Sequence, residues 1–289
     1  MSSLSPKTLL RRLGLRPKKS WGQHFLVHPH QARRIADALE LGADDTVVEI
    51  GAGLGALTVF LDQAAARVVA LELDPALARF LAEELFAEAP GVEVVCRDVL
   101  EFDFMALSRE AGAPLKVAGN LPYQITSPLL FKLIREAPAL SRAVLMMQQE
   151  VGDRLLAPPG TKDYGILSVL LQYNFLLKRL FTLTPANFYP PPQVSSVVLK
   201  LEPGSRQPRA RDEALLARVV KAAFGQRRKN LNNALVAQAS AFGLSPEELG
   251  AALREVGIDP VRRGETLGVA EFVALSNAIG ARAGELTRL

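Results

Sequence analysis

Short runs of apolar, mostly β-branched residues alternate with longer helical patterns between residues 46 and 150. Five of these runs are predicted to be strands: Thr46–Glu49, Arg67–Asp74, Val92–Val99, Leu115–Gly119 and Ala143–Met147. The helical segments expected among them are Ala56–Ala66, Pro75–Ala89 and Thr126–Glu136. Because the strand runs are continuously apolar, they indicate a parallel sheet covered by helices on both faces.

The pattern changes near residue 204. Before it, the sequence predicts a helical stretch near Tyr164–Tyr173 and a hairpin of Leu177–Leu183 with Ser196–Leu201. After the linker at Pro203-Gly204-Ser205, only helical patterns remain: Asp212–Phe224, Lys229–Ala239, Ser245–Val256 and Val269–Ala281. Ser245 followed by a proline and two acids is typical of a helix start. We therefore predict an N-terminal segment 1–30, an α/β domain 31–204 and a small all-α domain 205–289.

The composition narrows the class of protein. The chain has 289 residues, of which 49% are hydrophobic and 22% charged, as is usual for globular domains. The single Cys96 excludes a disulfide framework and a multi-cysteine metal site. No apolar run approaches the roughly 20 residues that span a bilayer, and no signal peptide is recognisable. We expect a cytoplasmic, soluble protein without membrane association or a metal.

The charge is unevenly distributed along the chain. Residues 1–30 contain six basic and no acidic residues, residues 31–204 have a net charge of −6, and residues 205–289 have a net charge of +4. An acidic body with basic ends suits a polyanion bound by the ends. A basic tail and a solvated helical face would give the same distribution, so charge alone leaves both interpretations open.

A glycine-rich turn, EIGAGLG over residues 49–55, joins the first predicted strand to the first helix. Gly51 and Gly53 let the backbone approach a ligand closely, at the strand edge where doubly wound sheets bind ligands. Glu72 near the end of the second strand could accept from ribose hydroxyls, and Asp98 after the third from an adenine amine. Together they describe a pocket for an adenosine. A nicotinamide-dependent oxidoreductase fits the same turn, and so does a plain tight turn with surface acids.

The fourth strand ends in Asn120-Leu121-Pro122-Tyr123. An aromatic amine is a poor nucleophile because its lone pair is delocalised into the ring. The Asn120 amide oxygen and the Leu121 carbonyl, which Pro122 stiffens, could accept the amine hydrogens and direct the lone pair toward a methyl group. Methyl transfer from a sulfonium needs neither a strong base nor a metal.

A target adenine must also be unstacked and held by its faces. Tyr123 is one candidate for this contact, and Phe188 in the proline-rich loop before the last predicted strand is the other. Stacking contributes about 1–3 kcal/mol per base. Either ring alone could equally be a core aromatic.

These motifs resemble the ribosomal RNA adenine dimethyltransferase family, and the similarity to its bacterial small-subunit branch extends from about Arg16 to Asn277. It rests on RPKKSWGQHFL (16–26), VEIGAGLG (48–55), NLPY (120–123), FYPPPQVSS (188–196), FGQRRKNLNN (224–233) and RRGETL (262–267). NLPY is specific for amine-directed methyltransferases, whereas the glycine turn is generic.

The resemblance implies a Rossmann-like class I methyltransferase domain that uses S-adenosylmethionine and releases S-adenosylhomocysteine. It implies that His24 and Leu26 approach the cofactor alongside Gly51, Glu72, Asp98 and Asn120. The implied substrate is 16S ribosomal RNA in an immature small subunit, where two adjacent adenines of a hairpin loop near the 3′ end become N6,N6-dimethyladenosine. We expect a monomer. A packed or solvated His24 remains an alternative.

Basic residues of the helical region are candidates for contacts with RNA phosphates: Arg227, Arg228, Lys229, Arg262 and Arg263. Solvated helix faces would explain them equally well. Two other functions remain open, a resistance-type 23S rRNA adenine dimethyltransferase and a ribosome assembly or transcription factor that acts by binding. The C-terminal motifs favour the small-subunit branch, and the intact NLPY favours an enzyme.

Overall fold

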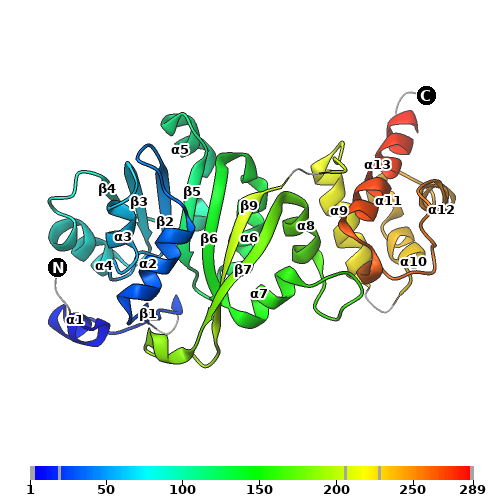
Figure 1. Ribbon diagram of the computed structural model, residues 1–289. Coiled ribbons are helices and arrows are strands. Elements are labelled where there is room, and N and C mark those ends of the chain that lie inside the picture. The colour runs from blue at the N-terminus through cyan, green and yellow to red at the C-terminus, as the bar shows by residue number, and fades with distance from the viewer. Residues whose placement is uncertain (1–3, 19–20, 205–206, 227–228, 287–289) are drawn as a thin grey trace. The chain divides into compact units, whose positions relative to one another are not determined.

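The computed structural model describes residues 4–18, 21–204, 207–226 and 229–286. By their contacts, the residues form two compact units (Figure 1). The first comprises Met1–Gly152 and Leu176–Pro203, and the second comprises Asp153–Phe175 and Gly204–Leu289.

The first unit is built on a seven-stranded sheet with the order β4-β3-β2-β5-β6-β9-β7. Its strands are β2 (Thr46–Ile50), β3 (Arg67–Glu72), β4 (Val92–Cys96), β5 (Leu115–Asn120), β6 (Leu140–Gln148), β7 (Phe175–Leu183) and β9 (Ser196–Pro203). Strands β2 to β6 are parallel, and β9 runs antiparallel to β6. The predicted α/β fold, with its five parallel strands, is confirmed. The chain reverses its strand order at β2, which lies between β3 and β5.

The apolar strand runs are continuous because both faces of the sheet are covered. Val47 and Val48 on β2 point to opposite faces, and neither is exposed to solvent. In Figure 1, α2 lies in front of the sheet and α6 lies behind it. Ile35 of α2 and Leu61 of α3 pack in one core cluster with side chains of β2, β5, β6 and β9.

The helices of the first unit are α1 (Pro6–Arg12), α2 (Pro29–Ala38), α3 (Thr58–Asp62), α4 (Pro75–Phe80), α5 (Phe104–Ala111) and α6 (Thr126–Arg135). Helix α7 (Gln149–Leu156) begins in it as well. Several predicted elements are shorter in the structure, among them the helix predicted over Ala56–Ala66, which is α3. The helix predicted from Pro75 continues beyond Phe80 as a π-helical turn, Leu81–Leu85. Strand β4 ends at Cys96 because Asp98 begins a 3₁₀ turn, its Oδ1 accepting from the Leu100 N–H at 2.8 Å.

The second unit is helical. Its helices are α8 (Ile166–Asn174), α9 (Glu213–Gly225), α10 (Leu231–Val236), α11 (Ala239–Phe242), α12 (Pro246–Glu255) and α13 (Val269–Leu286). The Phe224 ring lies 6.0 Å from those of both Tyr164 and Phe272, centroid to centroid. The predicted start of α12 is confirmed: the Ser245 N–H donates to the Glu248 carboxylate, and the Glu248 N–H donates to Ser245 Oγ.

The predicted limits assign residues 153–175 to the α/β domain 31–204, whereas the contacts in the structure group them differently. By contacts they belong with the C-terminal helices, since α8 packs on α9 and α13. The Tyr173 hydroxyl accepts from the Ala210 N–H at 3.1 Å, which ties α8 to the segment before α9. The apolar face of α8 is therefore buried by partners that follow it in the chain. The predicted limits at 30 and 204 stay a prediction.

Among the described residues, no helix is both long and apolar enough to cross a membrane. Over the same residues, no group of three or more His, Cys, Asp or Glu side chains is arranged to hold a metal ion.

Candidate active site

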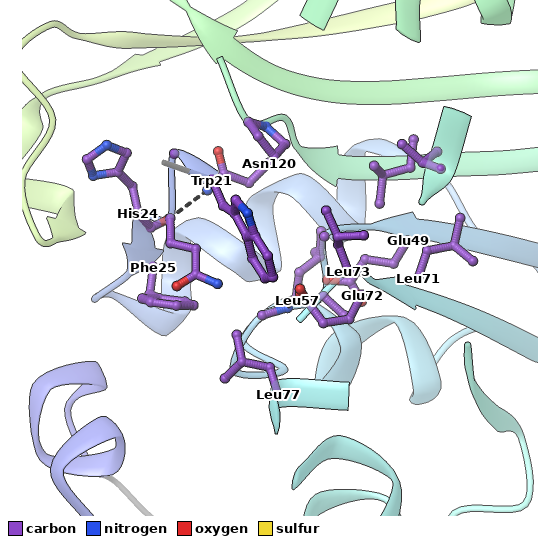
Figure 2. Close-up of a pocket in the computed structure, with 18 of the residues that line it drawn as sticks. Trp21, His24, Phe25, Glu49, Leu57, Leu71, Glu72, Leu73, Leu77 and Asn120 are labelled. Atoms are coloured by element: carbon purple, nitrogen blue, oxygen red, sulfur yellow. Dashed lines mark hydrogen bonds between the residues drawn. The ribbon is translucent and has the colours of Figure 1, made fainter. Parts of the chain in front are cut away.

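A cavity of about 210 Å³ opens at the carboxyl ends of β2, β3 and β5. This is where the strand order reverses, the place where open α/β sheets bind ligands. One wall comes from the turns after these strands, and the other from the N-terminal segment 21–26 (Figure 2). The structure therefore brings together residues of the N-terminal motif, the glycine turn and the NLPY motif.

The glycine turn passes close to the N-terminal segment. Gly53 has a φ of 59°, and a Cβ atom built on it would lie 3.2 Å from the Phe25 ring. Gly51 has a φ of 72°, also in the left-handed region that side chains disfavour. A side chain at Gly53 would therefore crowd the Phe25 ring at the cavity wall.

Glu72 lies at the end of β3 and lines the cavity from a buried position. Its Oε2 accepts from the Gly53 N–H and its Oε1 from the Asp74 N–H, both at 2.8 Å. Burial raises the pKa of this carboxyl, and the backbone donors oppose the rise. Each carboxylate oxygen can accept a second hydrogen bond, so Glu72 keeps capacity for ligand hydroxyls. Asp98 lines the same cavity and is half-buried, and its contact with an adenine amine stays a prediction.

The end of β5 places Asn120 in the cavity wall. Its Nδ2 donates to the His24 carbonyl at 2.8 Å, which leaves Oδ1 as the acceptor available to a ligand (Figure 2). The Leu121 N–H donates to the Met146 carbonyl at 2.8 Å, which fixes the backbone one residue further. In the described part of the chain, no hydrogen bond reaches Asn120 Oδ1 or the Leu121 carbonyl. The two predicted acceptors are thus unengaged.

The N-terminal segment is held over the cavity at several points. His24 Nδ1 lies 2.7 Å from the Pro190 carbonyl, which can only accept, so Nδ1 carries the proton. Strand β1 (Phe25–Leu26) pairs with β8 (Phe188–Tyr189). Asp74 accepts from Lys18 Nζ at 2.8 Å and from Gln23 Nε2 at 3.2 Å. These ties place His24, Phe25 and Leu26 in the cavity wall.

The two predicted stacking rings differ in placement. Tyr123 is not among the residues that line the cavity, although its neighbours Pro122 and Gln124 are, and its ring centroid lies 5.7 Å from that of His24. Phe188 is 4% exposed and packs in the core cluster with Leu26 and Ile35. The structure does not bring the Phe188 ring to the cavity, and its contact with a base stays a prediction.

Residues 14–279 match the family model described as ribosomal RNA adenine dimethylase. The chain belongs to this family.

Similar family members cover almost the whole chain. The ribosomal RNA small subunit methyltransferase A of Geobacter metallireducens is 47% identical over 279 residues, 96% of this chain and 100% of the relative. The protein of the same name from Myxococcus xanthus is also 47% identical, over 96% of this chain and 95% of its own length.

Solved structures agree with the fold. A dimethyladenosine transferase from Plasmodium falciparum superposes with a TM-score of 0.75 at 24% identity, covering 87% of this chain and 96% of its own. The 23S rRNA methyltransferase ErmE superposes with a TM-score of 0.65 at 26% identity, covering 88% of this chain and 99% of its own. The class I methyltransferase fold expected from the sequence is therefore confirmed for this dimethylase.

Sequence reasoning about this dimethylase overlooked two cavity residues. Glu49 on β2 is 2% exposed, and its Oε2 has no hydrogen-bond partner among the described residues. Burial raises the pKa of Glu49 to about 8. Trp21 projects into the cavity between the two walls (Figure 2). An acid inside an apolar strand, and the only tryptophan inside a specific motif, were the signals that could have found them.

The residues predicted to contact RNA in the helical unit differ in exposure and in their contacts within the protein. Arg227 and Arg228 lie outside the described residues. Lys229 and Arg263 are exposed. Arg262 is half-buried and engaged within the protein, since its guanidinium pairs with Glu271 and donates to the Thr266 carbonyl at 2.7 Å. These contacts give Arg262 a structural role, and its contact with RNA stays a prediction.

Proposed function

We propose that this dimethylase transfers methyl groups from S-adenosylmethionine to the exocyclic N6 of two adjacent adenines in a hairpin loop near the 3′ end of 16S rRNA. The products would be N6,N6-dimethyladenosine and S-adenosylhomocysteine, formed while the small subunit matures. We further propose that it acts as a monomer in the cytoplasm. The observation that carries the proposal is the unengaged Oδ1 of Asn120 at the rim of a cavity suited to an adenosine.

The cavity residues fit S-adenosylmethionine. A carboxylate at the end of β3, Glu72, suits ribose hydroxyls, and Asp98 suits an adenine amine. Glu49 adds a buried carboxyl oxygen that lacks a partner among the described residues, as expected where a ligand donor belongs. An amino group of the cofactor would be such a donor. The glycine turn leaves room that a Cβ at Gly53 would fill.

S-adenosylmethionine, when bound, supplies an electrophilic methyl group on a sulfonium. The work of the protein is then to present the adenine amine. Asn120 Oδ1 and the Leu121 carbonyl would accept its two hydrogens, and the nitrogen would become more nucleophilic as its geometry turns toward sp³. Because the His24 carbonyl holds the Asn120 amide in advance, little reorganisation is needed in the reaction. The proton of the cationic product can leave to solvent afterwards.

The adenine ring needs a surface beside these acceptors. Tyr123 is half-buried three residues after Asn120, and its hydroxyl lies 3.4 Å from Ser196 Oγ, which orients the ring. Pro122 restricts the backbone between the two residues. We propose that Tyr123 stacks on the flipped-out base, with Trp21 facing it or the cofactor across the cavity.

The small-subunit substrate is supported by the relatives named small subunit methyltransferase A, which match the chain over nearly its full length. A 23S rRNA substrate is the second candidate, since the ErmE structure shares the fold at 26% identity. The choice between them rests on the higher similarity to the small-subunit relatives.

The test is methyl transfer to defined substrates. Immature small subunits, mature small subunits and naked 23S rRNA would each be incubated with labelled S-adenosylmethionine, and the modified nucleosides mapped by mass spectrometry. We expect N6,N6-dimethyladenosine at two adjacent positions of 16S rRNA. Label on 23S rRNA alone would support the second candidate, and binding without any transfer would support a factor that acts by binding.

A further inference from the structure

The helical unit contains a second cavity, far along the chain from the residues of the candidate active site. It has a volume of about 500 Å³ and lies between α9, α10 and α11. Its apolar lining includes alanines and the buried face of Phe242. Two of its lining residues, Gly225 and Gln226, belong to the FGQRRKNLNN motif, and the proposed methyl transfer assigns no role to the cavity.

The polar groups at this cavity are two cations and two amides. Arg218 and Lys221 are exposed on one face of α9, three residues apart. The Arg218 Nη1 donates to the Ala241 carbonyl at 3.2 Å, which fixes the guanidinium across the opening. No carboxylate stands among the described residues that line the cavity, and neither cation has an ion-pair partner in that part of the chain. The site is therefore electropositive and partly preorganised.

The amides of Gln226 and Gln238 complete the set. Both side chains are exposed at the cavity, and among the described residues neither has a hydrogen-bond partner. A side-chain amide offers both donors and an acceptor, which is what the edge of a nucleobase requires. Cations recognise phosphates, an apolar floor accepts a base face, and amides read a base edge.

We propose that this cavity holds one unstacked nucleotide of the RNA substrate, with its phosphate on Arg218 and Lys221. The proposal rests on the proposed function, because it takes the RNA that the active site methylates as the ligand. RNA is recognised largely through unstacked loop bases, so a nucleotide held here would position the substrate while another is methylated. The net charge of +4 over residues 205–289 favours the same polyanion.

Gly225 offers a way to fill the cavity without changing its charge. It lines the cavity, its φ lies outside the left-handed region, and a Cβ built on it meets nothing within 4 Å. Gly284 on α13 has the same properties away from the cavity. Gly225→Leu therefore tests whether RNA binding requires an open cavity, and Gly284→Leu is its matched control. Lys221→Gln tests the charge, with Lys162→Gln, another exposed lysine of this unit, as its control.

The full-length variants would be titrated against a fluorescein-labelled single-stranded RNA at two salt concentrations, with AMP and UMP as free competitors. We expect Gly225→Leu to weaken RNA binding about tenfold, within the range that one bound base contributes. Lys221→Gln should weaken it less and reduce the slope of log affinity against log salt by about 0.7. Both controls should bind as the wild type does, and cofactor binding should be unchanged in all four variants.

Equal RNA affinity of Gly225→Leu and the wild type would overturn the proposal, even if Lys221→Gln binds weakly, because the charge would then act without the cavity. Displacement of the RNA by free AMP at the same concentration as the RNA would also overturn the proposal. The cavity would then be a site for a free nucleotide and not for one nucleotide of an RNA chain. Methyl transfer by the wild type is measured separately. Its failure would refute the proposed function and leave the comparison of RNA affinities intact.

Discussion

The side-chain amide of Asn120 donates to the backbone carbonyl of His24 at 2.8 Å, although 96 residues separate the two in the chain. The bond sets which end of the amide faces the cavity. An acceptor therefore faces the cavity before any substrate arrives, at the place where we propose that the amine binds.

Removal of that acceptor should slow methyl transfer. We expect Asn120→Ala to lower kcat about 10²- to 10³-fold, the usual cost of deleting one preorganised group that stabilises a transition state. Cofactor affinity, measured by calorimetry, should change much less. Asn277→Ala is the control, because Asn277 makes the same kind of bond, to the Arg209 carbonyl, in the helical unit. Equal kcat values for the two variants would contradict the assigned role.

Glu49 should make stability depend on pH. Burial raises the pKa of its carboxyl from 4.5 to about 8, so between these values the folded chain holds a proton that the unfolded chain has released. This stabilisation is complete below the unfolded pKa and is lost as the pH rises through about 8. A plot of unfolding free energy against pH should therefore fall less steeply for Glu49→Gln, by up to about 1.4 kcal/mol per pH unit. Urea unfolding of the wild type and of Glu49→Gln, between pH 4.5 and about 8, measures this difference. The same pH dependence of unfolding free energy in both proteins would refute the prediction.

The glycine turn can be tested with a matched pair. Gly53 and Gly112 both have φ in the left-handed region, but only at Gly53 would a Cβ meet another side chain, the Phe25 ring. Alanine at either position should cost about 1–2 kcal/mol of unfolding free energy from the backbone alone. We expect Gly53→Ala to cost more and also to weaken cofactor binding. Urea unfolding and calorimetry would show it, and equal behaviour of both variants would contradict the close approach.

Asp74 should act on the cofactor site through the N-terminal segment. It caps α4 and also binds Lys18 and Gln23, whereas Asp103 only caps α5. Alanine at either aspartate should cost about 1 kcal/mol of stability as a lost cap. Only Asp74→Ala should speed hydrogen exchange at residues 21–26 and raise the Kd for S-adenosylmethionine. Unchanged exchange in that segment would show that Asp74 does not hold it.

The regular part of this fold was predictable from local pattern. Continuous apolar runs predicted the parallel strands, and the cap residues predicted the start of α12. Helix α2 was not predicted, because Arg33 and Arg34 interrupt its apolar pattern. Their guanidinium groups lie over the Phe60 and Phe181 rings, contacts that depend on other elements.

The candidate site was predictable where a residue ends a strand or follows it directly. Gly51, Glu72 and Asn120 lie in the cavity wall because β2, β3 and β5 end at the same edge of the sheet. The burial of Phe188 was not visible in the sequence, since it follows from pairing with Leu26, 162 residues earlier. The raised pKa of Glu49 likewise depends on the elements that enclose it.

The pairing of β1 with β8 has a consequence for synthesis on the ribosome. The N-terminal wall of the cavity is translated before the turns that form the other wall, yet its partner strand ends only at Tyr189. The sheet strands β2 to β6 can assemble while the ribosome is still adding residues, whereas residues 21–26 must wait for that later strand. A nascent chain therefore completes this cavity only after β8 has been made.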